Sequence, residues 1–557
     1  MKQKRQLGLI ALLVSFSMVA AACGDDDNGD STSSDDAPTG GELVIAAEQE
    51  PDCMDWIASC AGASWGYWTA NVTTLPRPYV VSWDGENAAY EATELLDGEP
   101  TLETDGQQVV TYKLNDKVTW NDGTPVSSAD FVYTWEQIAQ GDDIYDKTGY
   151  DAIESVEAPD DTTVVVTFAT DFPDWKSLFG GGYGLMPSHI LKDADRAALM
   201  TDGYDFSAGP WVIEAWTKGE SITLVPNDGY WGDDKPKLDK VTFKFVTDTS
   251  AEFAAVKSGE VLVAYPQPQL DAIEQINAGL PGVQSSSNAR TGNLEALWLN
   301  NSKPPFDSEA VRQALGYALD RDEIVKALFG GIGVEEAAQA LEPAIVGQYT
   351  NLEAFAAYTK DLDKVDELMT GDGWAKNAEG IWEKDGLTAS FSIKTTAGNA
   401  RRELTEQIVQ EQAGEAGFEV TIDNQTPADL FGEQAPAGDY QATLYAQVLT
   451  TLSPGVCTLF CAKNNPDTSE DGSGQNWQRV NQPDAEPFME TVETSLDESE
   501  RESAGKEAQD ILAAAAVSLP LDPLPNILLW SDKVVGPVED NPVMGPFFNM
   551  QLWGVKS

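Results

Sequence analysis

The segment from Ala389 to Asp423 constrains the fold most strongly, because it reads as a strand, a helix and a second strand in succession. Phe391 and Ile393 alternate with polar residues, Leu404 and Ile408 repeat at helical spacing, and Gly417 precedes a second alternating run from Phe418 to Ile422. Two strands joined by a helix normally cross over and pair in parallel. The sequence therefore predicts a mixed α/β protein.

Other strands and helices are indicated along the chain. Alternation predicts strands around Val110 to Leu114, Val164 to Phe168 and Val241 to Phe245. Helix starts are predicted from capping boxes that pair Thr249 with Glu252, Asp320 with Glu323 and Asp497 with Glu500, and Gly259 and Gly330 are predicted helix ends.

The first 40 residues predict a targeting segment. Lys2, Lys4 and Arg5 precede an apolar run that ends in three alanines before Cys23. This order is typical of a secretion signal over residues 1–22, and the cysteine adds the prediction that it is lipidated. The alternative is that Cys23 merely lies near an ordinary cleavage site. Residues 23–40 are acidic and polar, so we expect a disordered tether.

The length and the net charge of the chain restrict the number of domains and the classes of partner that we expect. Removing residues 1–22 leaves 535 residues, which is more than one compact core usually holds. The formal net charge of −58 becomes −61, because the removed segment carries three cations and no acid. Nucleic acid is therefore excluded as a partner, since a polyanion would be repelled. The acidic residues are spread along the chain, which suits a solvated surface.

The remaining cysteines form two couples, Cys53 with Cys60 and Cys457 with Cys461. An even number outside the cytoplasm suggests disulfides, and pairing within each couple is the simplest of three connectivities. His189 is the sole histidine, so neither a zinc site nor any other metal site is predicted. No cofactor is expected.

Four segments together resemble the extracytoplasmic solute-binding proteins of the peptide and nickel uptake class, family 5. The first is "VTYKLNDKVTWNDGTPVSSADFVYTWE" at 110–136, in which Ser127 or Ser128 opens a helix, and the second lies at 208–263 and begins "GPWVIEAWTKGE" at Gly209. The third is "LWLNNSKPPFDSEAVRQALGYALDRDEIVKALFGGIG" at 297–333, with paired helices after Phe306 and Asp307. The fourth runs from Asn476 through "LPLDPLP" to the C-terminus.

The resemblance implies a type II periplasmic-binding-protein-like fold in its large, three-subdomain form, with mixed sheets and a hinge. One lobe is expected to contain 41–78, 202–298 and 518–557, with a subdomain at 79–201, and the other lobe 299–517. The hinges are expected near Leu299-Asn300 and near Ser518 to Leu521, with the ligand cavity between the lobes. Closure around the ligand would shift the population toward a closed state that a membrane permease can recognise.

The resemblance also suggests ligand contacts. Trp65 and Tyr67 follow the first strand, Tyr445 and Gln447 lie where peptide-binding members carry a Trp and an Asp, and Asn476 and Trp477 follow a glycine-rich loop. Each aromatic residue could instead belong to an ordinary core. No carboxylate stands between Tyr445 and Thr450, so the group that would hold a peptide amino terminus is missing there.

The function expected from these features is capture of an oligopeptide or a similar-sized polar solute for an ABC importer. The protein would be a monomer held outside the cell membrane by its lipid, would deliver its ligand to an ABC permease, and would have no catalytic residues. Two alternatives are a surface-anchored hydrolase that uses two carboxylates, and a solute-sensing surface protein without transport. No serine or cysteine nucleophile with a histidine is credible, because His189 would have to serve alone.

Overall fold

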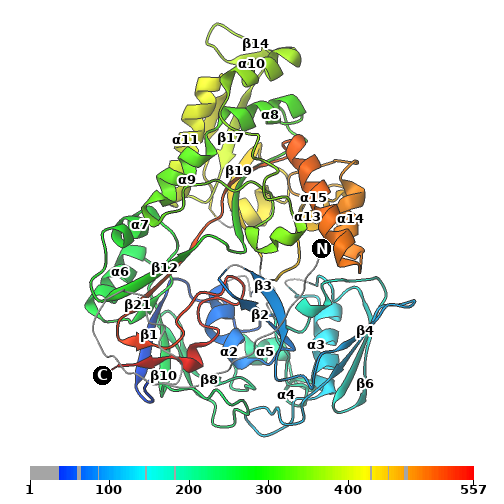
Figure 1. Cartoon of the computed structure of the whole chain (residues 1–557), viewed down its shortest axis with the longest axis vertical. Helices are drawn as coiled ribbons and strands as arrows, with labels where there is room; N and C mark the ends of the chain where they lie inside the picture. Colours follow the sequence, from blue (N-terminus) through cyan, green and yellow to red (C-terminus); the bar gives the residue numbers. More distant parts are fainter. Residues whose placement is uncertain are drawn as a thin grey trace, which may run out of the picture.

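The computed structural model describes residues 37–556, apart from 59, 61–63, 86, 145–146, 181–182, 427–428, 450 and 470–473. Figure 1 shows the chain as two lobes stacked along its long axis, a lower lobe that contains both the first strands and the C-terminal segment, and an upper lobe. The predicted signal, Cys23 and most of the predicted tether lie outside the described residues. None of the helices within the described range is long and apolar enough to cross a membrane.

The lower lobe is built on a seven-stranded sheet. Its strands, in spatial order, are β12 (Val283–Asn288), β21 (Asn526–Ser531), β11 (Val263–Ala264), β1 (Glu42–Ala47), β10 (Lys240–Phe245), β9 (Ser221–Pro226) and β8 (Trp211–Thr217). β10, β1 and β11 are parallel, and the remaining neighbours are antiparallel. Alternate residues of β10, Val241 and Phe243, are fully buried, as the sequence pattern predicted.

Two helices follow the parallel strands of this sheet, α6 (Thr249–Ser258) and α7 (Leu270–Asn277). The N-cap of α6 is Asp248, whose carboxylate accepts a hydrogen bond from the Ala251 N–H. The predicted capping box of Thr249 with Glu252 was therefore wrong by one residue. Gly259 ends the helix with a φ of 75°, the left-handed conformation that glycine adopts most easily.

A subdomain of the lower lobe carries a four-stranded sheet, β4 (Thr101–Glu103), β5 (Val109–Lys113), β7 (Thr163–Phe168) and β6 (Ile153–Asp160). Helix α3 (Ser128–Gln140) packs beside it, and its N-cap is Ser127, which agrees with the prediction that Ser127 or Ser128 opens a helix. Ser127 also forms a capping box with Asp130. A separate hairpin of β2 (Tyr79–Trp83) and β3 (Ala88–Ala92) faces the upper lobe.

The upper lobe contains a five-stranded sheet in the order β18 (Glu419–Ile422), β17 (Ser390–Lys394), β19 (Ala442–Val448), β13 (Asn293–Leu299) and β20 (Leu519–Asp522). β17 pairs in parallel with β18, and α11 (Ala400–Ala416) joins them. This confirms the predicted strand, helix and strand unit.

Helices cover the upper sheet. They are α8 (Glu309–Ala318), α9 (Arg321–Phe329), α10 (Leu362–Gly371), α13 (Val456–Phe460), α14 (Glu486–Thr494) and α15 (Glu498–Ala514). Asp320 and Asp497 cap α9 and α15 through their carboxylates, as predicted. α9 ends at Phe329, but Gly330 continues into a short 3-10 turn, and the left-handed residue is Gly333.

The chain crosses between the two sheets at 289–292 and at 523–525, because β13 and β20 both belong to the upper sheet. The expected hinges near Leu299-Asn300 and near Ser518 to Leu521 therefore fall inside or beside strands of that sheet. The two crossings are tied together, since the Thr291 hydroxyl donates to the Pro523 carbonyl at 3.0 Å. Leu524 has a φ of 37°, a strained conformation for a residue with a side chain.

Candidate functional site

The candidate site lies where the parallel strands of the lower lobe end beside the two crossings. β21 begins directly after the second crossing and runs away from the upper lobe, and β11 is antiparallel to it. β1 and β10 run parallel to β11, so the carboxyl ends of all three strands point toward the upper lobe. In open α/β sheets ligands bind outside the carboxyl ends of the strands.

The upper lobe presents the end of β19 to the same place. β19 is antiparallel to β13, and its last residue, Val448, pairs with Asn293 beside the first crossing. The next amide, Leu449 N–H, donates to the Gly292 carbonyl at 2.8 Å. Strand ends from both lobes therefore meet at the crossings.

Four aromatic side chains gather at the lower-lobe edge: Trp65, Trp68, Tyr265 and Phe547. Tyr265 directly follows β11, and its ring contacts Trp68 and Trp65 edge to face, with centroids 5.3 and 6.3 Å apart. Trp65 is only 3 % exposed, whereas Trp68 keeps part of its surface open. Of this group the sequence singled out Trp65, and Trp68 has more surface left for a ligand.

Three carboxyl groups that the sequence did not predict lie at this edge. Glu48 follows β1, and its carboxylate accepts from the Gln267 N–H at 2.9 Å. Asp540 accepts from the Tyr265 hydroxyl at 3.1 Å and from the Asn526 amide at 3.0 Å, and burial raises the pKa of Asp540. Carboxyl groups and aromatic rings therefore lie together at this edge.

Glu252 is the third of these carboxyl groups and is fully buried. Burial, and then the neighbouring charge of Glu48, raise its pKa well above the usual range. Neither carboxyl oxygen has a hydrogen bond of good geometry among the described residues. The Tyr265 backbone offsets part of the rise in the pKa of Glu252. Burial therefore favours the neutral form of the Glu252 carboxyl.

Tyr67 is buried beneath the lower-lobe surface and does not reach the aromatic group. Its hydroxyl accepts from the Arg77 guanidinium at 3.1 Å and donates to the Met544 sulfur at 3.4 Å. Burial raises the pKa of Tyr67. The polar atom of this residue is therefore used inside the lobe.

Tyr445 and Trp477 lie together in the upper lobe. The Tyr445 ring stacks on Trp298 at 5.3 Å and lies 6.1 Å from the Trp477 ring. The Gln478 amide donates to the Tyr445 hydroxyl at 3.1 Å. Tyr445 is buried, while Trp477 is partly exposed.

Gln447 is the predicted residue nearest to the crossings in the upper lobe. It lies two positions after Tyr445, so both side chains project from the same face of β19. It pairs with Leu294 and remains partly exposed. Gln447 can therefore offer an amide at the edge that faces the lower lobe.

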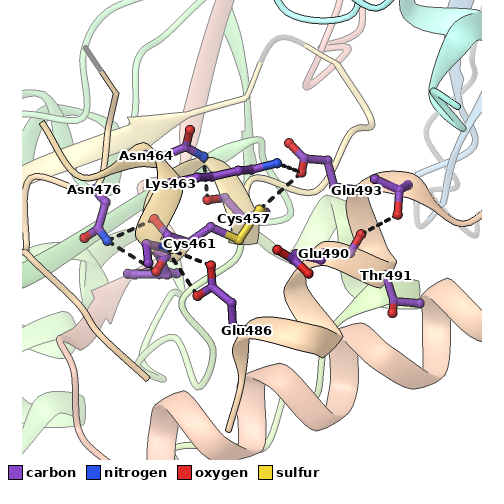
Figure 2. The surroundings of a disulfide bond; sticks show 12 residues. Cys457, Cys461, Lys463, Asn464, Asn476, Glu486, Glu490, Thr491 and Glu493 are labelled. Atoms are coloured by element: carbon purple, nitrogen blue, oxygen red, sulfur yellow. Dashed lines mark hydrogen bonds and ion pairs between the residues drawn. A yellow bond between two sulfur atoms is a disulfide. The ribbon is translucent and has the colours of Figure 1, made fainter. Parts of the chain in front are cut away.

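Asn476 supports the upper lobe from within. Its side-chain amide donates to the carbonyls of Phe460, Cys461 and Val480, and its oxygen accepts from the Val480 N–H at 2.8 Å. Figure 2 shows this amide beside the Cys457–Cys461 disulfide. All its hydrogen-bonding groups are thus occupied inside the lobe.

The structure joins the cysteines within each couple, Cys53 to Cys60 and Cys457 to Cys461. Around the second bond, Asn464 donates to the Cys457 carbonyl at 2.9 Å, and Glu486 accepts from the Ala462 N–H at 3.0 Å (Figure 2). These contacts fix α13, whose Phe460 packs beside Trp298 at 6.4 Å.

Two shallow cavities of about 150 and 270 Å³ lie in the upper lobe. Both include Ser392 and Gln441, and Gln441 directly precedes β19. β19 then runs seven residues to its far end at the crossings, a distance of roughly 20 Å. Neither cavity therefore belongs to the candidate site.

Within the described residues, no group of three or more His, Cys, Asp or Glu side chains is arranged to hold a metal ion. His189 lies 3.0 Å from an Asp122 carboxylate oxygen and packs beside Trp120. Asp467, which begins an acidic turn, pairs with Arg479 at 2.8 Å.

Comparison with known proteins assigns the family. The profile of the bacterial extracellular solute-binding proteins, family 5 Middle, matches residues 93–465. The chain belongs to this family. Family 5 proteins bind solutes and are not enzymes, and they work outside the cytoplasm.

Individual relatives agree with this assignment. The oligopeptide-binding protein AppA of Bacillus subtilis is 24 % identical over 532 residues, which is 93 % of each chain. A solved periplasmic EDTA-binding protein, EppA, matches 95 % of this chain and 98 % of its own with a TM-score of 0.81 and 22 % identity. The solved structure of Bacillus subtilis AppA with a nonapeptide matches 94 % and 100 % with a TM-score of 0.74 and 22 % identity. The predicted type II fold is confirmed.

Proposed function

We propose that this family 5 protein is the substrate-binding component of an ABC importer, and that it captures an oligopeptide or a similar-sized polar solute between its lobes. The observation that carries the proposal is the meeting of the lower-lobe carboxyl edge with the Gln447 end of β19 at the two crossings. Two short crossings let the lobes rotate as bodies, and a ligand that contacts both lobes favours the closed arrangement.

The proposed ligand contacts come from the predicted residues that lie near this edge. Trp65, with Trp68, supplies an aromatic surface in the lower lobe, and Tyr445, Gln447 and Trp477 supply aromatic and amide groups in the upper lobe. Partly exposed aromatic rings with a few polar groups are typical of ligand sites. Tyr67 and Asn476 are proposed to support these contacts from the interior.

The class of ligand is left broad for a chemical reason. The stretch from Tyr445 to Thr450 contains no carboxylate that could hold a free amino terminus. Among the structural relatives, one is described as EDTA-binding and another was solved with a nonapeptide. The same fold therefore holds solutes of different charge, and a peptide, an opine or an oligosaccharide each fits the proposal.

The proposal includes the location. Cys23 would carry the lipid, residues 23–40 would act as a tether, and the monomer would wait at the outer face of the cell membrane for its permease. A flexible tether of this length keeps its ends roughly 20 to 25 Å apart. Globomycin-sensitive processing and labelling with a fatty acid, both lost in Cys23→Ala, would test this part.

Ligand capture is tested with residues 24–557, purified, unfolded to remove bound solute and refolded. Native mass spectrometry of the protein before unfolding identifies a co-purified ligand, and thermal shift and calorimetry then test peptide, opine and oligosaccharide mixtures. We expect one class to raise the melting temperature in proportion to the logarithm of its concentration. Absence of any bound or stabilising solute would refute the proposal.

A matched pair of tryptophan variants tests the site. Trp477→Leu should weaken binding by about fivefold or more, because losing a tryptophan contact at the centre of a binding site costs about 1 kcal/mol or more. Trp231→Leu is the control, since Trp231 is also partly buried and also donates its indole N–H to a backbone carbonyl, but lies in the lower lobe away from the crossings. Equal losses in both variants would argue against the site.

A further inference from the structure

The lobes touch at a second place, away from the two crossings. In Figure 1 the crossings lie on the left, whereas α14 and α15 lie on the right, directly above the subdomain of the lower lobe. Here Arg501 of α15 donates to both carboxylate oxygens of Asp174 at 2.8 Å. We call this pair, with the groups that surround it, the interlobe latch.

Groups of the upper lobe alone hold the Arg501 side chain in position. Its Nε donates to the Val492 carbonyl at 2.9 Å, and its guanidinium lies over the Tyr349 ring at 4.7 Å. The Tyr349 hydroxyl in turn donates to the Glu498 carboxylate. One end of the guanidinium is therefore held within the upper lobe, and its Nη2 points at Asp174.

Asp174 supplies the lower-lobe half of the latch. Within the part of the chain that the structure describes, the recorded partners of its carboxylate are Arg501 and Ser453, and both belong to the upper lobe. The side chain of Asp174 is 12 % exposed and that of Arg501 is 2 % exposed. Separating the lobes would therefore remove every one of these partners together.

Tyr90 on β3 makes the neighbouring contact. Its hydroxyl accepts from the Leu452 N–H at 3.0 Å and bonds to the Thr451 side chain. Apolar side chains exclude water around both contacts: Val81, Val543 and Met544 come from the lower lobe, and Ile345, Val346, Tyr349 and Leu452 from the upper lobe. The latch is thus an apolar patch in which the ion pair of Asp174 with Arg501 joins the two lobes.

Burial and ion pairing together favour the closed arrangement in which Asp174 and Arg501 are paired over any other arrangement of the two lobes. Burying an unpaired charge is costly, whereas an ion pair with short charge-assisted hydrogen bonds, such as those from Arg501 Nη2 to both Asp174 oxygens, recovers much of that cost. Closure that leaves Asp174 and Arg501 out of register would bury the Asp174 carboxylate without its ion-pair partner, whereas Arg501 would keep Glu498 of the upper lobe at 3.4 Å. Opening would expose the apolar cluster as well as separate the charges.

We propose that the Asp174–Arg501 pair is a latch that sets the ratio of closed to open protein. The pair must break each time the lobes open, because the crossings and the latch lie on opposite sides of the molecule. This property does not depend on the ligand, so it can hold even if the proposed function fails.

The test uses ligand-free residues 24–557 with spin labels on Leu102→Cys in the subdomain and Leu387→Cys in the upper lobe, both exposed positions. Double electron–electron resonance measures the distance between the lobes. We expect a major short distance, and we expect Asp174→Asn to lower the ratio of closed to open protein at least about tenfold, as for truncation of one partner in a desolvated pair.

Asp467→Asn is the matched control. Asp467 also accepts two hydrogen bonds from a buried arginine, Arg479, at 3.1 and 2.8 Å, but both residues belong to the upper lobe. We expect its distance distribution to match that of the parent. Tyr90→Phe provides a second variant that keeps the ion pair, and we expect a smaller shift in the same direction.

The proposal is overturned if the parent is mainly open, or if Asp174→Asn leaves the distribution unchanged. It is also overturned if Asp467→Asn shifts the distribution as much as Asp174→Asn, since the effect would then be general loss of an ion pair. A melting temperature of Asp174→Asn close to that of the parent would show that the variant is folded.

Discussion

Glu342 gives a stability prediction whose sign and size follow from the structure. The residue lies in the upper lobe just before a 3-10 segment at Ala344–Tyr349, and it is buried. One carboxyl oxygen accepts from the Gly455 N–H at 3.2 Å, and the other has no hydrogen-bond partner among the described residues. Burial raises the pKa of Glu342 from 4.5 to about 8.

The sign follows from proton linkage. Between pH 4.5 and about 8 the folded state keeps the Glu342 proton while the unfolded state has released it, so the free energy of unfolding falls as pH rises through this interval. Each pH unit costs up to about 1.4 kcal/mol, so the full interval amounts to roughly 5 kcal/mol as an upper limit. Above pH 8 the loss is complete.

Glu342→Gln removes this dependence, because the amide keeps the shape and the acceptor of the neutral acid. Urea unfolding at pH 5 should give nearly equal free energies for the variant and the parent, and at pH 9 the variant should be more stable by several kcal/mol. Glu411→Gln, at an exposed position of α11, is the control and should not change the slope. A difference between Glu342→Gln and the parent that is the same at every pH would refute the reasoning.

Three further predictions concern stability. Gly505→Ala should destabilise the protein by about 1 to 3 kcal/mol in urea unfolding, because the added Cβ would lie 1.9 Å from the Tyr349 carbonyl oxygen. Gly414→Ala is the control: its Cβ would enter open space on α11, so this variant should be more stable than the parent by up to about 1 kcal/mol. Equal effects would contradict this. Replacing Cys457 and Cys461 with serine should lower the free energy of unfolding by roughly 2 kcal/mol, measured without reductant, and an unchanged midpoint would oppose it. Arg402→Met should cost about 1.5 to 3 kcal/mol in urea unfolding, because it removes charged hydrogen bonds to the fully buried Glu295 carboxylate while Arg401 stays paired with that carboxylate. Lys360→Met, which breaks the more exposed pair with Glu415, should cost at most about 1 kcal/mol in the same assay.

Where local signals agree, the sequence predicts the element well. The unit from Ala389 to Asp423 was predicted because alternation, helical spacing and Gly417 all indicate the same structure, and Gly417 indeed ends α11 with a φ of 98°. Agreement among independent local preferences is what makes a segment fold one way.

The start of α6 is a place where the local sequence does not determine the structure. Asp248 and Thr249 are both good N-caps, so the sequence alone does not choose between them. With Asp248 as the N-cap, Glu252 is the fourth helical residue and not the third, which is the position from which a glutamate reaches back to the cap. The structure buries Glu252 beside Glu48.

The hinge and the site required long-range information. β13 reads as a buried strand, but nothing in its own residues says which sheet it joins, so the expected crossing was misplaced. Likewise, Tyr265 meets Asp540 across 275 positions of sequence, and only the paired strands bring them together. Tyr445 and Gln447 were named because the family resemblance points to that strand, and the contact of Tyr445 with Trp477 was not predictable from the sequence.

The net charge of the chain and the charge of its site are set by different physics. The formal net charge of −58 counts every carboxyl as ionised, which holds for groups in water. At the lower-lobe edge, burial raises the pKa of Glu252 well above its usual range and also raises the pKa of Asp540, so desolvation shifts both carboxyls toward the protonated form. An acidic composition therefore does not by itself require a cationic ligand, because desolvation and not composition fixes the charge that a bound solute would meet.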